Sequence, residues 1–304
     1  MMKRVLTTSV VAGLLGTLGV APVVSAEGTL YGSVRSGIMI TDSDGADAMW
    51  DLGAIDAGDL DSGDRLWSRI GVRASHELDG GMTAGLHIEK RLDGFRTRHQ
   101  NVWLSGGFGK LTFGQQGSPY HSAVAWDGTN FTGGNFAMAP GGSRKSGISY
   151  ASSLGGPFEF KALVVDDNSH GKGYGQGVDG LELSGSLSMG AVNINAGYAD
   201  NDNETLMGAT VGGSLRGLGW EVGFETKDPD DGSEDTDLAG FFVDYDLGDG
   251  APYFYLEDQS GASDDRAWVV GYGHSLGSGV RVVGEHRDVE SSGTTSILAV
   301  VVSF

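Results

Sequence analysis

Apolar and polar residues alternate with a period of two along most of this chain. In the segment 181–189, leucine, glycine or methionine alternates with glutamate or serine, and in 192–198 the apolar residues face away from Asn193 and Asn195. A period of two places successive side chains on opposite faces of a β-strand. The pattern predicts sixteen strands, over about residues 28–41, 65–78, 82–92, 97–106, 110–117, 144–152, 157–166, 178–189, 191–199, 204–216, 219–227, 237–247, 251–258, 265–276, 280–289 and 294–304.

The connections between these segments alternate between tight turns and longer polar loops. Glycine-rich turns such as 79–81, 107–109 and 277–279 follow even-numbered segments, whereas loops such as 42–64 and 228–237 follow odd-numbered ones. Short turns on one rim and long loops on the other are typical of up-and-down barrels in outer membranes, with both termini on the short-turn side. An even number of strands lets the last strand pair with the first, which leaves no free edge.

The loop after residue 117 differs from the other long connections. Residues 118–143 show no period, carry aromatic side chains and paired glycines, and contain a single acid, Asp127. Aperiodic loops of this length are uncommon in compact proteins unless they are functional. Low charge and aromatic content suit a segment that packs against other parts of the protein. We therefore expect residues 118–143 to fold into the lumen of the barrel, at about mid-height, and to narrow it.

The first 26 residues have the three parts of a secretory signal peptide. Lys3 and Arg4 form a basic start, an apolar run reaches Val24, and the small-residue end is Val24-Ser25-Ala26. A transmembrane anchor is the alternative, but glycines and a proline interrupt the run. The longest apolar run in the rest of the chain is 297–302, far short of the roughly 20 residues of a spanning helix, so any membrane crossing must use a barrel. We predict a signal peptide at 1–26 and a β-barrel at 27–304.

Composition excludes several classes of protein. Without Lys3 and Arg4, 18 of the 20 basic residues remain against 40 acidic ones. This balance argues against a nucleic-acid partner, because phosphates need a basic surface. The chain has no cysteine, which excludes small disulfide-stapled folds. Glycine accounts for 53 of 304 residues without a three-residue period, which excludes collagen and suits strands that curve and pair closely.

Alternation alone fits a soluble sandwich, whose apolar face is inside, or a membrane barrel, whose apolar face is outside. The signal peptide, the two unlike rims and aromatic residues near strand ends, where interfacial girdles lie, favour the barrel. The predicted fold is therefore all-β: a transmembrane antiparallel up-and-down β-barrel of 16 strands with the long third loop in the lumen. A soluble exported β-rich binding or adhesive protein is the alternative. The aromatic residues in question are Trp220, Phe224, Tyr245, Phe254, Trp268, Tyr272 and Phe304.

Four features carry a family resemblance: the start EGTLYGSVRSG, the hairpin RIGVRASHELDGGMTAGLHIE, the hairpin VWLSGGFGKLTFGQQ with its long loop, and the terminal Phe304. In these features the chain resembles the general porins of Gram-negative bacteria. The resemblance implies a homotrimer of sixteen-stranded barrels in the outer membrane, in contact with lipid and lipopolysaccharide, that passes small hydrophilic solutes and ions. Two features depart from the family. The lumen face of the last strand is apolar (Ile297, Ala299 and Val301), and the third loop has few acids, which leaves the sign of selectivity open.

Basic residues of the first strands share the polar face. Alternation places Arg35, Arg69 and Arg73 opposite aliphatic residues, and places Arg91 on the same face as Glu89. An arginine facing lipid at mid-membrane costs about 2–4 kcal/mol, so we expect these side chains in the lumen. The porin resemblance implies a charged constriction between such a basic wall and the third loop. An alternative is that the arginines only pair with acidic neighbours such as Glu89 and hold the wall together. The predicted constriction residues are Arg35, Arg69, Arg73, Arg91, Asp127 and Lys145.

The acidic loop at 228–237 offers oxygen donors that could bind Ca²⁺. Their spacing does not match an EF-hand, and a solvated acidic rim is the alternative. No other cofactor is expected. An enzyme is not expected either, because the seven histidines are scattered and the chain has no G-x-S-x-G or H-E-x-x-H motif; an outer-membrane barrel hydrolase stays as a further alternative. The oxygen donors of the acidic loop are Asp228, Asp230, Asp231, Glu234, Asp235 and Asp237.

Overall fold

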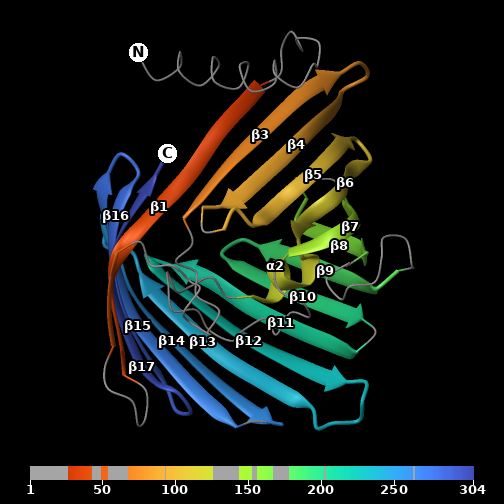
Figure 1. Cartoon of the computed structure of the whole chain (residues 1–304). Coiled ribbons are helices and arrows are strands. Elements are labelled where there is room, and N and C mark those ends of the chain that lie inside the picture. Colours follow the sequence, from red (N-terminus) through yellow and green to blue (C-terminus); the bar gives the residue numbers. More distant parts are fainter. Residues whose placement is uncertain are drawn as a thin grey trace.

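The computed structural model (Figure 1) describes residues 27–42, 49–53, 68–92, 94–125, 144–152, 156–166, 178–201, 203–262 and 264–304. These residues form seventeen β-strands and the short helix α2. No helix among them is long and apolar enough to cross a membrane. The elements are β1 (Glu27–Asp42), β2 (Met49–Gly53), β3 (Arg69–Leu78), β4 (Met82–Arg91), β5 (Thr97–Gly106), β6 (Gly109–Gly117), α2 (Pro119–Val124), β7 (Arg144–Ala151), β8 (Phe158–Val165), β9 (Gly180–Met189), β10 (Val192–Asn201), β11 (Glu204–Leu215), β12 (Leu218–Pro229), β13 (Thr236–Tyr245), β14 (Gly250–Gly261), β15 (Asp265–Gly277), β16 (Val280–Val289) and β17 (Gly293–Ser303).

The strands form one antiparallel sheet that closes on itself. From β3 onward each strand pairs with the next one along the chain, and β17 returns to pair with β1, where Ser33 lies opposite Ser303 and Asp42 opposite Thr294. Figure 1 shows the wall curving round from β1 through the strands to β16 and β17 beside it. Closure satisfies the backbone groups that a free sheet edge would expose. The predicted up-and-down barrel is confirmed.

Strands β2 and β3 share the second position of the wall. Both pair with the same edge of β1: β2 lies opposite Gly37 to Thr41, and β3 lies opposite Glu27 to Ser33. The other edge of β1 is taken by β17. The seventeen described strands therefore fill sixteen positions, as the period of the sequence predicted, and each of the sixteen predicted segments overlaps an observed strand.

The outer face of the barrel is apolar and the inner face is mixed. On β17, Leu298 and Val300 are 56% and 43% exposed, whereas the alternate residues Ile297 and Ala299 are 4% and 1% exposed. Large apolar surfaces are rarely left open to water, but they suit a wall that faces lipid. The apolar inner face predicted for the last strand is also present, because Ile297, Ala299 and Val301 pack inside the barrel with Met39 and Val283.

Two short elements were not predicted. Strand β2 falls within the segment 42–64, which was expected to be a loop, because a five-residue strand between acidic and glycine-rich residues shows no clear alternation. Helix α2 falls within the loop that was expected to be aperiodic. It begins with Ser118 as N-cap, whose hydroxyl accepts from the His121 N–H at 2.9 Å, and with Pro119 in the first turn. The Ser-Pro start favours a helix, but six residues are too few to show its period.

Candidate functional site

The third loop begins on the inner wall of the barrel. Helix α2 contacts β8, β9, β10 and β11, and its N-cap Ser118 is fully buried. The Ser118 hydroxyl donates to Glu182 Oε2 of β9 (2.6 Å), and the Tyr120 N–H donates to the same oxygen (3.4 Å). Lys145 of β7 is only 6% exposed, and its positive charge interacts favourably with the Glu182 carboxylate. These contacts attach the start of the loop to the wall.

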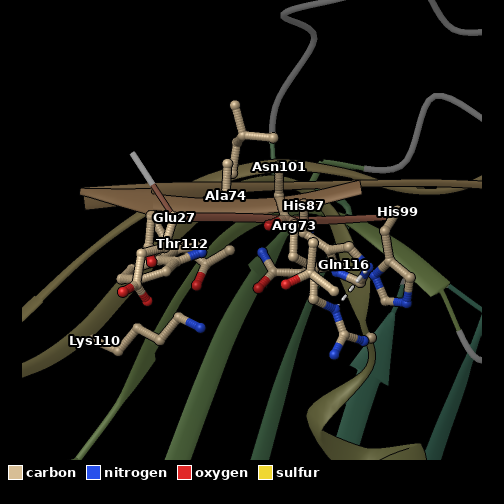
Figure 2. Close-up of a pocket in the computed structure, with 14 residues that line it drawn as sticks. Glu27, Arg73, Ala74, His87, His99, Asn101, Lys110, Thr112 and Gln116 are labelled. Carbon is tan, nitrogen blue, oxygen red and sulfur yellow. Dashed lines mark hydrogen bonds between the residues drawn. The ribbon is translucent and has the colours of Figure 1, made fainter. Parts of the chain in front are cut away.

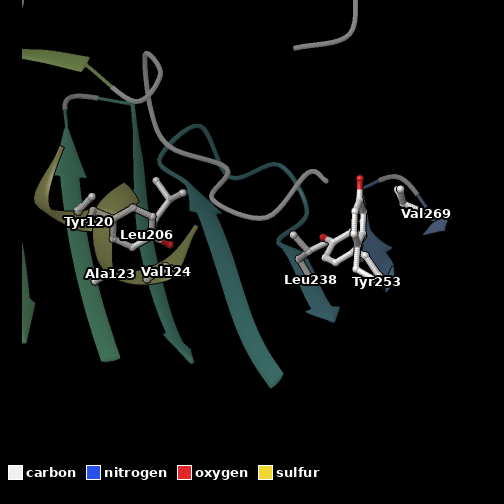
Figure 3. Close-up of a cluster of buried hydrophobic side chains, with 9 residues drawn as sticks. Tyr120, Ala123, Val124, Leu206, Leu238, Tyr253 and Val269 are labelled. Carbon is white, nitrogen blue, oxygen red and sulfur yellow. The ribbon is translucent and has the colours of Figure 1, made fainter. Parts of the chain in front are cut away.

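A pair of glycines makes room for α2. Gly197 of β10 lies directly opposite Gly208 of β11, near the middle of both strands. A Cβ at Gly197 would lie 2.8 Å from Tyr120, and one at Gly208 would lie 2.6 Å from Val124. Figure 3 shows Tyr120 and Val124 beside the β11 side chain Leu206. A larger residue at either glycine would push α2 off the wall, so the two positions form a notch that sets α2, the start of the loop, near the middle of these strands.

Tyr120 connects α2 to a further strand. Its hydroxyl donates to Glu225 Oε1 of β12 at 2.5 Å, and both side chains are 0% exposed. Burial and the adjacent carboxylate raise the pKa of Tyr120 above its ordinary value, so the hydroxyl stays protonated and can donate. The loop is described as far as Ala125; the predicted constriction residue Asp127 lies outside the described residues.

Four of the predicted arginines lie on β1, β3 and β4. The register sets Arg69 opposite Ser33 and opposite Arg91, and Arg35 follows Ser33 by two residues on the same face of β1. Arg35, Arg69 and Arg91 therefore share one stretch of inner wall, and Arg73 lies on its short-turn side. In the order of strands around the wall, β1 is eight positions from β10, half-way round the barrel. The arginines thus lie across the lumen from α2, whereas Lys145 is separate from them.

Glu89 neutralises part of this basic wall. Glu89 is 2% exposed and its carboxylate accepts from the Tyr31 hydroxyl (2.7 Å) and from Arg98 Nε (2.6 Å), with Arg69 Nη1 at 3.8 Å. Arg98 reaches Glu89 because the register between β4 and β5 shifts at Glu89 and Lys90. Such a bulge re-aims a side chain. Strict alternation would place Arg98 on the outer face, which is why sequence reasoning did not select it.

Beside Arg73 the inner wall is hollowed into a cavity of about 550 Å³, which we call the recess. Arg73 and Lys110 both extend into it, and His87 and His99 lie next to Arg73 (Figure 2). The two imidazole rings stack with their centroids 4.3 Å apart, and Arg73 Nε donates to His87 Nε2 at 3.4 Å. The rest of the polar lining includes Glu27, Asn101, Thr112 and Gln116.

The acidic loop at 228–237 lies within the described residues. The described residues contain no group of three or more His, Cys, Asp or Glu placed to hold a metal ion. Asp231 instead accepts from the hydroxyl (2.6 Å) and the N–H (2.9 Å) of Ser233, and these hydrogen bonds lower the pKa of Asp231. The carboxylate that was considered as a Ca²⁺ donor thus shapes a local turn.

A sequence model described as Gram-negative porin matches residues 7–294. The chain belongs to the Gram-negative porin family. As a member of that family, this porin forms its channel in the outer membrane. A comparison with curated proteins finds no match.

Solved structures share the fold of this porin at low sequence identity. OmpT of Vibrio cholerae, folded in vitro and in its trimer form, is 15% identical with a TM-score of 0.71, and the match covers 92% of this chain and 100% of OmpT. An anion-selective porin from Comamonas acidovorans is 18% identical with a TM-score of 0.68, covering 92% and 100%. A mutant of Rh. blastica porin is 16% identical with a TM-score of 0.65, covering 91% and 100%. All three support the closed barrel.

Several residues of the recess were missed by sequence reasoning. Lys110, Thr112 and Gln116 lie on one face of the strand predicted at 110–117, so the period could have identified them. The same period places Tyr31 on the lumen face with Arg35, and Trp103 on the face of Asn101. It does not indicate which cation each ring contacts.

Proposed function

We propose that this porin is a passive diffusion channel for small hydrophilic solutes and ions, with its constriction between the third loop and the basic wall. The observation that carries the proposal is the position of α2. The helix sits on the inner wall at about mid-height; of the arginine-bearing strands, β1 lies half-way round the barrel from β10, and β3 and β4 are the next two positions. A loop that continues from this position into the lumen would reduce the open cross-section of the barrel at the level of the basic wall.

On the basic side of the constriction we place Arg35, Arg69, Arg73 and Arg91, and on the loop side Asp127. Opposite charges across a water-filled gap would orient the dipoles of passing solutes and disfavour apolar ones. Lys145 has a different role in this proposal. Because it is buried and its charge acts on Glu182, the carboxylate that holds the start of the loop, it stabilises the attachment of α2 and does not face the solute path.

We infer that the constriction prefers anions. The acidic outer loops raise the cation concentration at the mouth, but salt screens that effect within about 8–10 Å. The arginines act at the narrowest zone, where a solute passes close to them and water is limited. The basic wall therefore determines the sign of selectivity, and the acidic rim modulates it.

We further propose that residues 1–26 are a cleaved signal peptide, that 27–304 form the porin domain, and that three copies assemble as a homotrimer in contact with outer-membrane lipid and lipopolysaccharide. The trimer form of OmpT of Vibrio cholerae, which shares the fold, supports this assembly. Family membership favours a channel that needs no cofactor over the hydrolase that the sequence left open.

Planar bilayers test the proposed channel. The purified, folded protein should give stepwise conductance, and its reversal potential in a salt gradient should have the sign of anion preference. The absence of steps from a folded sample would contradict the channel, as would recovery of the protein in the soluble periplasmic fraction. A cation-selective reversal potential would contradict only the role given to the basic wall.

A further inference from the structure

Two cations of the inner wall lie over aromatic rings. The Arg73 guanidinium carbon is 4.7 Å from the centroid of the Tyr31 ring, and the Lys110 ammonium nitrogen is 4.5 Å from the centroid of the Trp103 ring. Both cations line the recess. A cation–π contact fixes the position of a cation through the ring quadrupole and leaves its net charge in place, whereas an ion pair brings a compensating carboxylate.

Each of these rings is itself held against a glycine of the neighbouring strand. A Cβ at Gly71 would overlap the Tyr31 ring, and a Cβ at Gly85 would overlap the Trp103 ring. A glycine within a strand leaves a space that an aromatic ring from the next strand can cover. The rings are therefore packed on the backbone on one face and carry a cation on the other. Arg73 and Lys110 are thus positioned before any solute arrives.

Several other cations of the described chain are paired with carboxylates. Arg98 and Arg69 lie at Glu89, and ion pairs elsewhere on the wall join Lys161 to Glu159 (3.1 Å) and Arg287 to Glu257 (3.7 Å). The same is true of Lys227 with Glu204 (2.8 Å) and Arg266 with Asp258 (2.9 Å). Neither Arg73 nor Lys110 forms an ion pair with the described residues. The recess therefore holds two fixed cations whose charge is available to a solute.

We propose that the recess is a binding subsite for small organic anions, carboxylates or phosphate monoesters, held between Arg73 and Lys110. The volume of about 550 Å³ falls in the range of small-molecule sites. Guanidinium and ammonium groups donate charge-assisted hydrogen bonds to carboxylate and phosphate oxygens. Because Arg73 uses its Nε–H on His87, its terminal amino groups are the donors assigned to the anion.

Neutral polar groups and one acid complete the recess. Asn101 and Thr112 line the same cavity and offer polar groups to the hydroxyl groups of a solute. Glu27 is exposed and lines the same cavity, so it opposes an anion. With two cations against one carboxylate, the balance favours anions, and removal of the Glu27 charge should strengthen their binding. The subsite rests on the proposed channel, because a solute must enter the lumen to reach it.

The test is current block in planar bilayers, with succinate and glucose 6-phosphate as probes and uncharged glucose as the reference. The wild type should be blocked saturably by at least one of the two anions. Arg73→Gln and Lys110→Gln should each raise the half-blocking concentration by about tenfold or more, as expected for a lost charge-assisted hydrogen bond. Glu27→Gln should lower it. Lys227→Gln, which removes a cation already paired with Glu204, should leave it unchanged.

The outcomes separate failure of the proposed subsite from failure of the proposed channel. All variants should keep stepwise conductance in potassium chloride, which shows that the barrel is assembled. Block by only one probe, weakened in both cation variants, supports the subsite and assigns its ligand to carboxylates or to phosphate esters. Normal conductance with equal block by glucose, or with block that neither cation variant weakens, overturns the subsite and leaves the channel standing. A wild type without conductance overturns both.

Discussion

Four of the five buried glutamates among the described residues accept from tyrosine hydroxyls, the exception being Glu182. An unpaired carboxylate inside a protein is costly unless donors surround it. Tyrosine suits this position, because its ring covers the backbone of a neighbouring strand while its hydroxyl reaches the carboxylate; the Tyr253 ring, for example, covers Gly271. The described pairs are Tyr31 with Glu89, Tyr120 with Glu225, Tyr253 with Glu285, and Tyr255 with Glu257.

The pair of Tyr120 with Glu225 makes a prediction about α2. Tyr120→Phe removes one hydrogen bond from a fully buried carboxylate, a loss of about 1.5–3 kcal/mol for a bond to a charged group. Helix α2 should then detach from the wall more often, and hydrogen exchange of its amides should accelerate by about tenfold or more. Tyr245→Phe is the matched control, since Tyr245 is the last residue of β13 and is 45% exposed. Equal exchange in both variants would show that Tyr120 does not hold the helix.

The basic wall makes a second prediction. Replacing Arg35 and Arg73 together by serine removes two positive charges from the side of the lumen that faces the loop. The reversal potential in a salt gradient should shift towards cation selectivity, while barrel assembly is unchanged. Arg266→Ser is the control, because Arg266 is 59% exposed and paired with Asp258 near the loop rim. A reversal potential that the double variant leaves unchanged would place the two arginines away from the solute path.

In the proposed channel, the third loop is the element that narrows the barrel. Its start is fixed by a helix with three separate attachments: the N-cap on Glu182, the glycine notch of Gly197 and Gly208, and the Tyr120 hydrogen bond. Fixing one end of a loop inside the barrel reduces the range of positions that the following residues can reach. We therefore expect the loop to set the size limit of the channel.

Removal of residues 127–136 tests this expectation. The deletion leaves α2 and the wall intact, so single-channel conductance and the size limit for neutral sugars should both rise. Replacing residues 230–235, between β12 and β13, by a short glycine–serine turn is the matched control and should change neither quantity. If the first deletion alters nothing and the loop is cleaved by protease added to intact cells, then the loop lies outside the barrel.

Closure of the barrel joins the two ends of the described chain. Gly32 N–H donates to the Phe304 carbonyl (3.0 Å), and Phe304 N–H donates to the Gly32 carbonyl (3.1 Å), which continues the pairing of β1 with β17. With every edge paired, further association must use the apolar outer face and not strand addition. This geometry is compatible with the proposed homotrimer.

If the protein is a homotrimer, as proposed, its mobility in SDS electrophoresis should depend on heating. Samples kept at room temperature should migrate as a trimer, because SDS does not readily open a closed barrel or the packed faces between barrels. Boiling should convert them to a single band of one chain. Cross-linking in intact outer membranes is the independent measurement. A monomer by both methods would contradict the homotrimer without affecting the channel.

The period of the sequence determined most of the fold by itself. A side-chain period of two is a local property of the strand, so sixteen segments, the polarity of each face and the apolar inner face of Ile297, Ala299 and Val301 could all be predicted. The placement of Arg69 and Arg73 on the inner face follows from the same parity. Strand β2 and helix α2 were not predicted, because elements of five or six residues are too short to show a period.

Only the tertiary structure decided which inner-wall charges are compensated. Contacts between strands depend on register and on local bulges, and neither is encoded in the period: the bulge beside Glu89 brings in Arg98, and the packing of α2 buries Lys145. The rings of Tyr31 and Trp103 lie under Arg73 and Lys110 because Gly71 and Gly85 come opposite them across the strands. The parity of the sequence therefore determined the face of Arg69 and Arg73, and the pairing between strands determined which inner-wall cations have a carboxylate beside them.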